Sequence, residues 1–139
     1  MKHTSIDRIR TYRASGVERL VELAKFLDGL PGGLLTFSRW YGHRRGCAVG
    51  LAVVHSAWIK AQGLDLADEA CLKDCRPVYR GRSDWDAVAA FFEIDIDTAR
   101  RLFSRIGYAG EMRPHPRAVA AAIRRHLAIT RFKRKKCEI

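Results

Sequence analysis

Residues 46–54 are apolar at every position, with the sequence Gly-Cys-Ala-Val-Gly-Leu-Ala-Val-Val. A helix without a polar face must be covered by neighbours on all sides, so this segment predicts a central helix of a globular core. Gly46 and Gly50, four residues apart, would let another backbone approach closely. We expect the helix to run to about Gln62 and to stop at Gly63. The segment is too short for the ~20 apolar residues of a membrane span.

A capping box precedes a second helix. In Ser15-Gly16-Val17-Glu18, the Ser15 hydroxyl and the Glu18 carboxylate can each satisfy a free amide at the start of a helix. Apolar residues then recur at helical spacing as far as Gly29. The pattern predicts a helix over residues 16–28.

Three further helices are expected in the second half of the chain. Ser83 is placed to cap a helix that reaches residue 92, and Asp95 or Asp97 to cap the next one, which ends at Gly107. The last helix is expected over residues 116–132.

The fold prediction is therefore mainly α, a single-domain bundle of about five helices over residues 1–132, with a basic tail over residues 133–139. Residues 64–82 have weak periodicity, and a short β-hairpin there has no support from the sequence.

Residues 88–103 have the spacing of a helix-turn-helix. Glu93 stands at the turn position that usually takes Gly, while Asp95 and Asp97 place negative charge where the second helix would meet DNA phosphates. A helical corner used only for packing is the alternative to a DNA-reading motif.

The motifs of the middle of the chain are similar to those of a group of small uncharacterised proteins of bacteria and phages. These proteins share a Cys-Ala-x-Gly-x-Ala helix, which residues 47–52 match as Cys-Ala-Val-Gly-Leu-Ala, and a Phe-Phe-x-Ile/Leu…Ala-x-x-Leu-Phe helical pair, which residues 91–94 and 99–103 match. The resemblance implies a pattern of helix packing and assigns no activity.

Positive charge is concentrated at one end of the sequence. Residues 100–139 contain twelve Lys and Arg against Glu111 and Glu138, a net charge of +10 out of +11 for the whole chain. Charge gathered in this way attracts polyanions or acidic protein surfaces. A solvated end that serves only solubility is the simpler alternative for the tail.

No catalytic motif is recognisable, so we expect a protein that is not an enzyme and has no cofactor. His43, Cys47, Cys71 and Cys75 are ligand types suited to zinc, but their spacing is atypical and free thiols are the simpler interpretation. The first residues contain no apolar segment of the kind found in secretory signals, which favours a cytoplasmic protein.

The function expected from these features is binding of a nucleic acid or a nucleic-acid-containing complex. The alternative is a protein-directed inhibitor or adaptor of the mobile-element or phage type, bound to an acidic protein surface. Neither involves a membrane. The expected binding residues are Arg100, Arg101, Arg105, Arg117, Arg124, Arg125, Arg131, Lys133, Arg134, Lys135 and Lys136.

Overall fold

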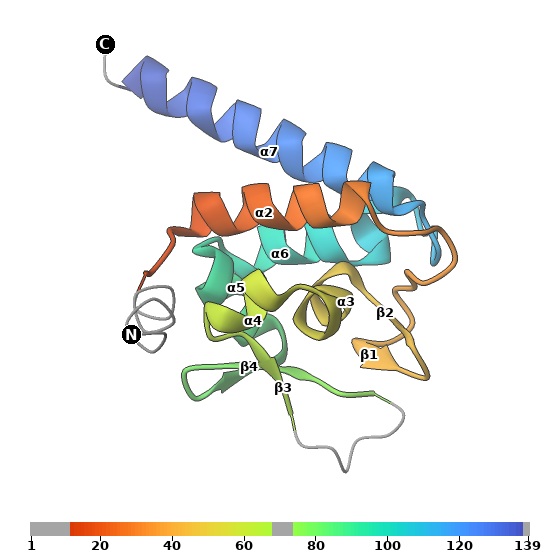
Figure 1. The fold of residues 1–139 in the computed structure, drawn as a ribbon. Coiled ribbons are helices and arrows are strands. Elements are labelled where there is room, and N and C mark those ends of the chain that lie inside the picture. Colours follow the sequence, from red (N-terminus) through yellow and green to blue (C-terminus); the bar gives the residue numbers. More distant parts are fainter. Residues whose placement is uncertain (1–11, 68–73, 138–139) are drawn as a thin grey trace.

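The computed structural model describes residues 12–67 and 74–137 and is mainly α-helical (Figure 1). A long helix pair lies on one side of the molecule, and two small antiparallel sheets lie on the opposite side. The α-helices of the described residues are α2 (Gly16–Asp28), α3 (Ala48–His55), α4 (Ala57–Ala61), α5 (Asp84–Phe92), α6 (Ile96–Phe103) and α7 (Pro116–Cys137), and the short 3-10 helix η1 (Arg105–Tyr108) follows α6. None of these helices has the length and apolar character needed to cross a bilayer.

Helix α2 has the predicted bounds, and both hydrogen bonds of its capping box are present. A second carboxylate adds to this cap, because Glu93 Oε1 accepts a hydrogen bond from the Gly16 amide at 3.0 Å. A Cβ on Gly16 would overlap the Phe92 carbonyl group, so only glycine lets the start of α2 lie directly on the end of α5.

The apolar segment is buried as predicted, but it does not form one helix. Every residue from Ala48 to Val53 is buried in α3. Ser56 then adopts an extended backbone, and its side chain accepts a hydrogen bond from the Ile59 amide at 3.3 Å. The serine therefore ends α3 and caps α4, where continuous hydrophobicity alone had predicted no break.

The close backbone approach expected at Gly46 and Gly50 is confirmed. A Cβ at either position would overlap the Trp40 carbonyl oxygen. The approaching backbone belongs to the segment that leads into a hairpin, not to a second helix.

Short strands form two small sheets that the sequence did not predict. Strands β1 (Tyr41–Gly42) and β2 (Arg45–Gly46) form a hairpin, and β3 (Asp65–Leu66), β4 (Pro77–Tyr79) and β5 (Arg82–Ser83) form an antiparallel sheet with β4 in the centre. The two-residue turns have positive φ, at His43 and Arg44 in the first hairpin and at Arg80 and Gly81 between β4 and β5. This geometry suits the twist of a tight hairpin.

The caps of α5 and α6 differ from each other. Ser83 occupies the N-cap position of α5, but its side chain makes no capping hydrogen bond, contrary to expectation. Asp95 caps α6 and accepts a hydrogen bond from the Thr98 amide at 2.6 Å, which confirms the first of the two predicted caps. Helix α6 ends at Phe103, earlier than predicted, and Gly107 lies inside η1.

Helix α7 packs along α2 and continues beyond its predicted end at residue 132, through most of the expected tail, to Cys137. Val119, Ala120 and Ile123 are buried in the core, whereas every residue from Ala128 to Lys133 is exposed. In Figure 1 the helix diverges from α2 toward its C-terminal end. The first half of α7 is therefore structural, and the second half projects from the body.

Arg19 on α2 is a buried cation that joins four elements. Its side chain is 2% exposed, and its guanidinium donates to the Phe91 carbonyl at 2.8 Å, to the Tyr79 hydroxyl at 3.3 Å and to Gln62 Oε1 at 3.3 Å. The guanidinium carbon lies 4.3 Å from the centroid of the Phe91 ring. None of the ion pairs among the described residues includes Arg19, so carbonyl, hydroxyl and amide oxygens and an aromatic face stabilise this charge.

Candidate nucleic-acid interface

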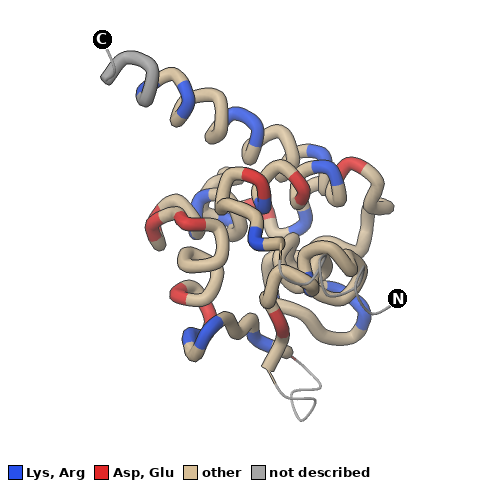
Figure 2. Tube along the Cα trace, turned by 60° about the vertical axis from the view of Figure 1, so that its left-hand side comes forward, with Lys and Arg blue, Asp and Glu red and all other residues tan. Residues whose placement is uncertain are grey.

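Helix α7 carries eight Lys and Arg residues and no Asp or Glu. Figure 2 shows basic positions distributed along the coloured part of this helix, while acidic positions lie on the body below it. The predicted residues Arg117, Arg125, Arg131 and Lys133 are exposed, and we refer to these four as the cationic face. Arg134, Lys135 and Lys136 were also predicted, and the structure describes their backbone but not their side chains.

Arg124 differs from the cationic face, because it forms a bidentate ion pair with Asp28 at the end of α2. Its two terminal nitrogens donate to the two carboxylate oxygens at 3.2 and 2.5 Å. The hydrogen bonds from Arg124 hold the pKa of Asp28 below its ordinary value. Of the predicted binding residues Arg117, Arg124 and Arg131 on this helix, Arg124 thus pairs with α2 and is neutralised there.

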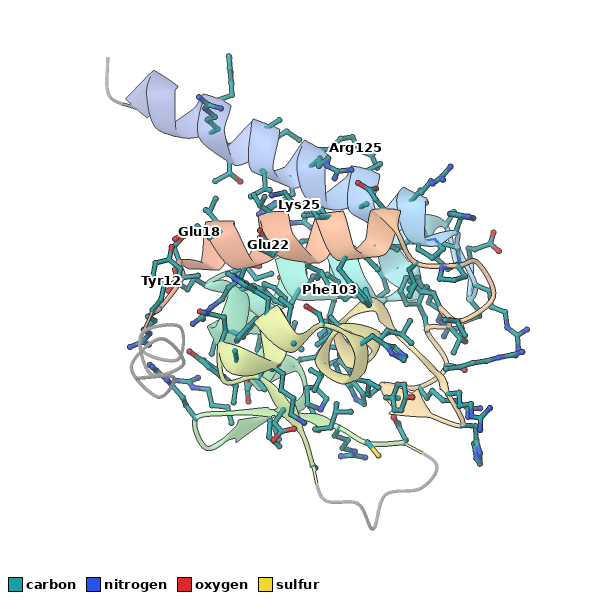
Figure 3. All side chains as sticks on the ribbon, in the orientation of Figure 1. Tyr12, Glu18, Glu22, Lys25, Phe103 and Arg125 are labelled. Carbon is teal, nitrogen blue, oxygen red and sulfur yellow. The ribbon has the colours of Figure 1, made fainter. Side chains whose placement is uncertain are left out.

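The carboxylates at the start of α2 do not neutralise the cationic face. Glu18 accepts hydrogen bonds from the Tyr12 hydroxyl and the Ser15 amide, and Glu22 pairs with Lys25 at 3.5 Å. Figure 3 shows Glu18, Glu22 and Lys25 on α2, with Arg125 on the neighbouring α7. Among the described residues, Arg124 is the one cation of α7 that forms an ion pair.

Arg101 and Arg125 lie where α6 and η1 approach α7. Arg101 donates to Thr98 Oγ1 at 3.2 Å, and its charge adds to burial in lowering the pKa of His126. Burial raises the pKa of Tyr108 above its ordinary value, and the nearby charge of Arg125 opposes this shift. The Tyr108 hydroxyl donates to the Leu102 carbonyl at 2.8 Å, which fixes the ring at the edge of this surface.

The corner between α5 and α6 has a packing role in this structure. Glu93 adopts the left-handed conformation, with φ of 55°, at the turn position where glycine is usual. Its carboxylate caps α2, and the start of α2 lies against the end of α5. Asp97 stands exposed in the first turn of α6, beside the cap Asp95. These contacts favour the packing alternative over a DNA-reading helix-turn-helix.

A pocket that was not predicted from the sequence lies beside α6. A cavity of about 200 Å³ is lined by residues that include Trp40, Trp85, Asp74 and Ser104. The rings of Trp40 and Trp85 are 4.7 Å apart at an interplanar angle of 59°, and the guanidinium of Arg100 lies 6.0 Å from the Trp85 ring centroid. The aromatic residues at 37, 40 and 41 were one signal in the sequence, but nothing local paired them with Trp85.

The four residues considered as zinc ligands are not brought together in the part of the chain that is described. His43 stands exposed at a hairpin turn, Cys47 is buried at the start of α3, and Cys71 lies outside the described residues. Among the described residues, no three His, Cys, Asp or Glu side chains are grouped as a metal site requires. Burial raises the pKa of Cys47 to about 11, so its thiol is neutral at physiological pH.

Comparison of the chain with known protein families, curated proteins and solved structures finds no match.

Proposed function

We propose that this protein binds nucleic acid without catalysing a reaction, and that the cationic face of α7 makes the principal contacts with phosphates. The observation that carries the proposal is a 22-residue helix with no acidic residue, whose residues from Ala128 to Lys133 are all exposed. A helix of this length spans about 33 Å. Side chains along it can therefore reach several successive phosphates of one strand.

The energetics favour a polyanion over a compact anion. Each phosphate neutralised by Lys or Arg releases condensed counterions, which lowers log affinity by about 0.9 per tenfold increase in salt on duplex DNA and about 0.7 on single strands. Among the described residues, Arg117, Arg125, Arg131 and Lys133 belong to no ion pair, so no ion pair has to be broken before they bind a phosphate. Arg124 would first have to leave Asp28.

The test is the salt dependence of binding, measured by fluorescence anisotropy with labelled 20-nucleotide DNA and RNA between about 50 and 300 mM salt. In the α7 variant, Arg117, Arg125 and Arg131 are replaced by Gln. The control variant carries the same change of net charge at Arg44, Arg45 and Arg82, exposed residues of the two sheets on the side away from α7 (Figure 1). We expect the α7 variant to lose about 2 to 3 units of slope and the control to keep the wild-type slope.

Two outcomes contradict the proposal. If wild-type protein binds neither DNA nor RNA at about 50 mM salt, nucleic acid is not the partner. If both variants lose the same slope, binding follows net charge and the cationic face has no special role. Circular dichroism of each variant establishes that the fold is retained.

An acidic protein surface is the alternative partner, and exposed apolar residues on α7 favour it. Ile129 and Phe132 are 55% and 64% exposed, and Val17 and Val21 line a groove between α2 and α7. Large apolar side chains of this kind are typical anchors of protein interfaces. Pull-down from nuclease-treated and untreated lysate separates the two candidates, because only capture of a nucleic-acid partner depends on intact nucleic acid.

A further inference from the structure

The pocket beside α6 combines aromatic rings that pack at tilted angles with cations at its rim. Segments distant in the sequence form it: the loop before β1, the start of α5 and the end of α6, with Asp74 before β4 and Cys47 before α3. The inner cavity of about 200 Å³ continues into a second hollow, which shares Phe37, Ser38, Trp85 and Ser104 with it and adds Arg100 and Arg105. We refer to the two hollows together as the aromatic pocket.

The rings of the pocket are held in place by the fold yet remain partly accessible. Trp40 and Trp85 are both half-buried. The amide of Trp40 donates to Asp74 Oδ1 at 2.6 Å, which anchors the loop that carries this ring. Phe37 packs on Tyr108 with ring centroids 5.3 Å apart. A planar ligand would therefore meet aromatic walls that are already formed, so little free energy would be spent on ordering side chains when it binds.

The distribution of charge orients a ligand that has an aromatic end and an anionic end. Asp74 lines the inner cavity, where its carboxylate repels a phosphate but can accept a hydrogen bond from an amino group. Arg100 and Arg105 line the outer hollow, where they can pair with a phosphate. An aromatic group is therefore favoured inside and a phosphate outside.

The size of the cavity restricts the ligand further. Sites for drug-sized molecules usually enclose about 300–1,000 Å³, so the inner cavity of about 200 Å³ suits one ring system, and the outer hollow of about 540 Å³ leaves room for an adjoining sugar and phosphate. A paired base within a duplex cannot enter, because its faces are covered by its neighbours. A base that is unpaired and unstacked presents its face to the pocket.

We propose that the aromatic pocket holds one unpaired base of a single-stranded nucleic acid, with the adjoining phosphate on Arg100 and Arg105. This inference rests on the proposed function, and it adds that the preferred partner is single-stranded. The pocket and the cationic face are connected through Tyr108, which packs on Phe37 and lies close to Arg125. One strand can thus contact α7 with its phosphates and the pocket with a base.

The test compares two ligands that differ only in their bases: a deoxycytidine decamer and a decamer of the same length made of abasic sites. Both carry the same phosphates. Binding of the full-length protein is measured at about 150 mM salt. We expect the cytidine decamer to bind about tenfold more tightly, because stacking of a base on an aromatic ring adds to the phosphate contacts.

A matched pair of variants shows whether the preference for the cytidine decamer arises in the aromatic pocket. Trp85→Leu removes a ring of the pocket, and Trp58→Leu makes the same change on α4, at a half-buried residue that does not line the pocket. We expect Trp85→Leu to bind both decamers with equal affinity and Trp58→Leu to keep the tenfold difference. If Trp85→Leu does not fold, the Trp58→Phe protein replaces it, since its fluorescence then comes from Trp40 and Trp85 alone. The cytidine decamer should quench this fluorescence and the abasic decamer should leave it unchanged.

The outcomes separate the two proposals. Equal binding of both decamers by wild-type protein overturns the base pocket and leaves the proposed function standing. Binding of neither overturns the base pocket, and the proposed function is then decided by its own test at about 50 mM salt. A tenfold preference that persists in Trp85→Leu places the base elsewhere. Quenching by both decamers in Trp58→Phe, or by neither, shows that the base does not stack on Trp40 or Trp85. Acidic polyglutamate that displaces the cytidine decamer at an equal concentration of charge would also overturn the inference, because it has no bases.

Discussion

Replacing Gly50 by alanine should destabilise the protein, although alanine is the better helix former. A Cβ at this position would overlap the Trp40 carbonyl oxygen, with the Trp40 carbonyl carbon at 2.8 Å and Tyr41 Cβ at 3.0 Å. The carbonyl is not free to retreat, because it accepts a hydrogen bond from the Cys47 amide at 3.1 Å. The loop that carries Trp40 must therefore move away from α3.

The expected change in the free energy of unfolding of Gly50→Ala is the sum of three contributions. Overpacking of a close contact costs about 1–3 kcal/mol, and loss of the hydrogen bond to Cys47 costs about 1 kcal/mol. The higher helix propensity of alanine returns about 1 kcal/mol. We expect the free energy of unfolding to fall by about 2 kcal/mol, which corresponds to a decrease in Tm of about 8 °C for a chain of this size.

Thermal unfolding followed by circular dichroism measures this change, with Gly29→Ala as the matched control. A Cβ on Gly29 would meet only the Phe26 carbonyl oxygen, at 3.9 Å, so the control should keep its Tm within about 2 °C. Movement of the Trp40 loop should also separate the Trp40 and Trp85 rings and change the tryptophan emission. A Tm of Gly50→Ala equal to or above that of wild type would refute the packing argument.

Three further predictions concern other parts of the molecule. Because burial raises the pKa of Cys47 to about 11, a protein that retains Cys47 as its single cysteine should react with a thiol reagent at pH 8 only when denaturant is added; rapid reaction of the native protein would show that the thiol is accessible. The pKa of Asp28 is lowered by Arg124, so the contribution of Asp28 to stability is present above its ordinary pKa and is lost as pH falls through its folded value. The free energies of unfolding of wild type and Asp28→Asn, measured in urea, should therefore differ at pH 7 and converge at pH 2. An equal difference at both pH values would show that the ion pair between Asp28 and Arg124 is not the cause of the difference. Arg44→Gly should raise the free energy of unfolding by about 1 kcal/mol, because Arg44 has a φ of 66° that glycine adopts without strain, and an unchanged urea midpoint would count against strain in this turn.

The sequence was sufficient to predict those elements whose structure depends only on residues close by in the chain. The start of α2 could be predicted, because Ser15 and Glu18 satisfy each other's amides within one turn. The break at Ser56 could not, because a serine between apolar residues reads equally well as the interior of a continuous helix. The hairpin turn at His43 and Arg44 lacks the Asn-Gly signature of its geometry, and strands of two residues are too short to show alternation.

The candidate site, too, could be predicted from the sequence only in part. The basic character of α7 was evident from composition, but the pairing of Arg124 was not, because its partner Asp28 lies 96 residues away in the sequence. The aromatic pocket was hidden for the same reason, since Trp40 and Trp85 are 45 residues apart in the sequence and meet only in the packed fold. Residue type predicted the chemistry of the surface, and only the tertiary structure shows which groups are already engaged.

The buried guanidinium of Arg19 has a consequence for how the molecule comes apart. Detachment of α4, β4 or α5 would remove one hydrogen-bond acceptor from the Arg19 guanidinium, which cannot be deprotonated. The remaining acceptors could not make up for the hydration that the guanidinium lost when it was buried. Partial unfolding of any one of these elements therefore carries the added cost of a buried charge with a missing acceptor. These elements and α2 should exchange their amide hydrogens as one cooperative unit, while residues 128–133 of α7, which are exposed, exchange independently and much faster.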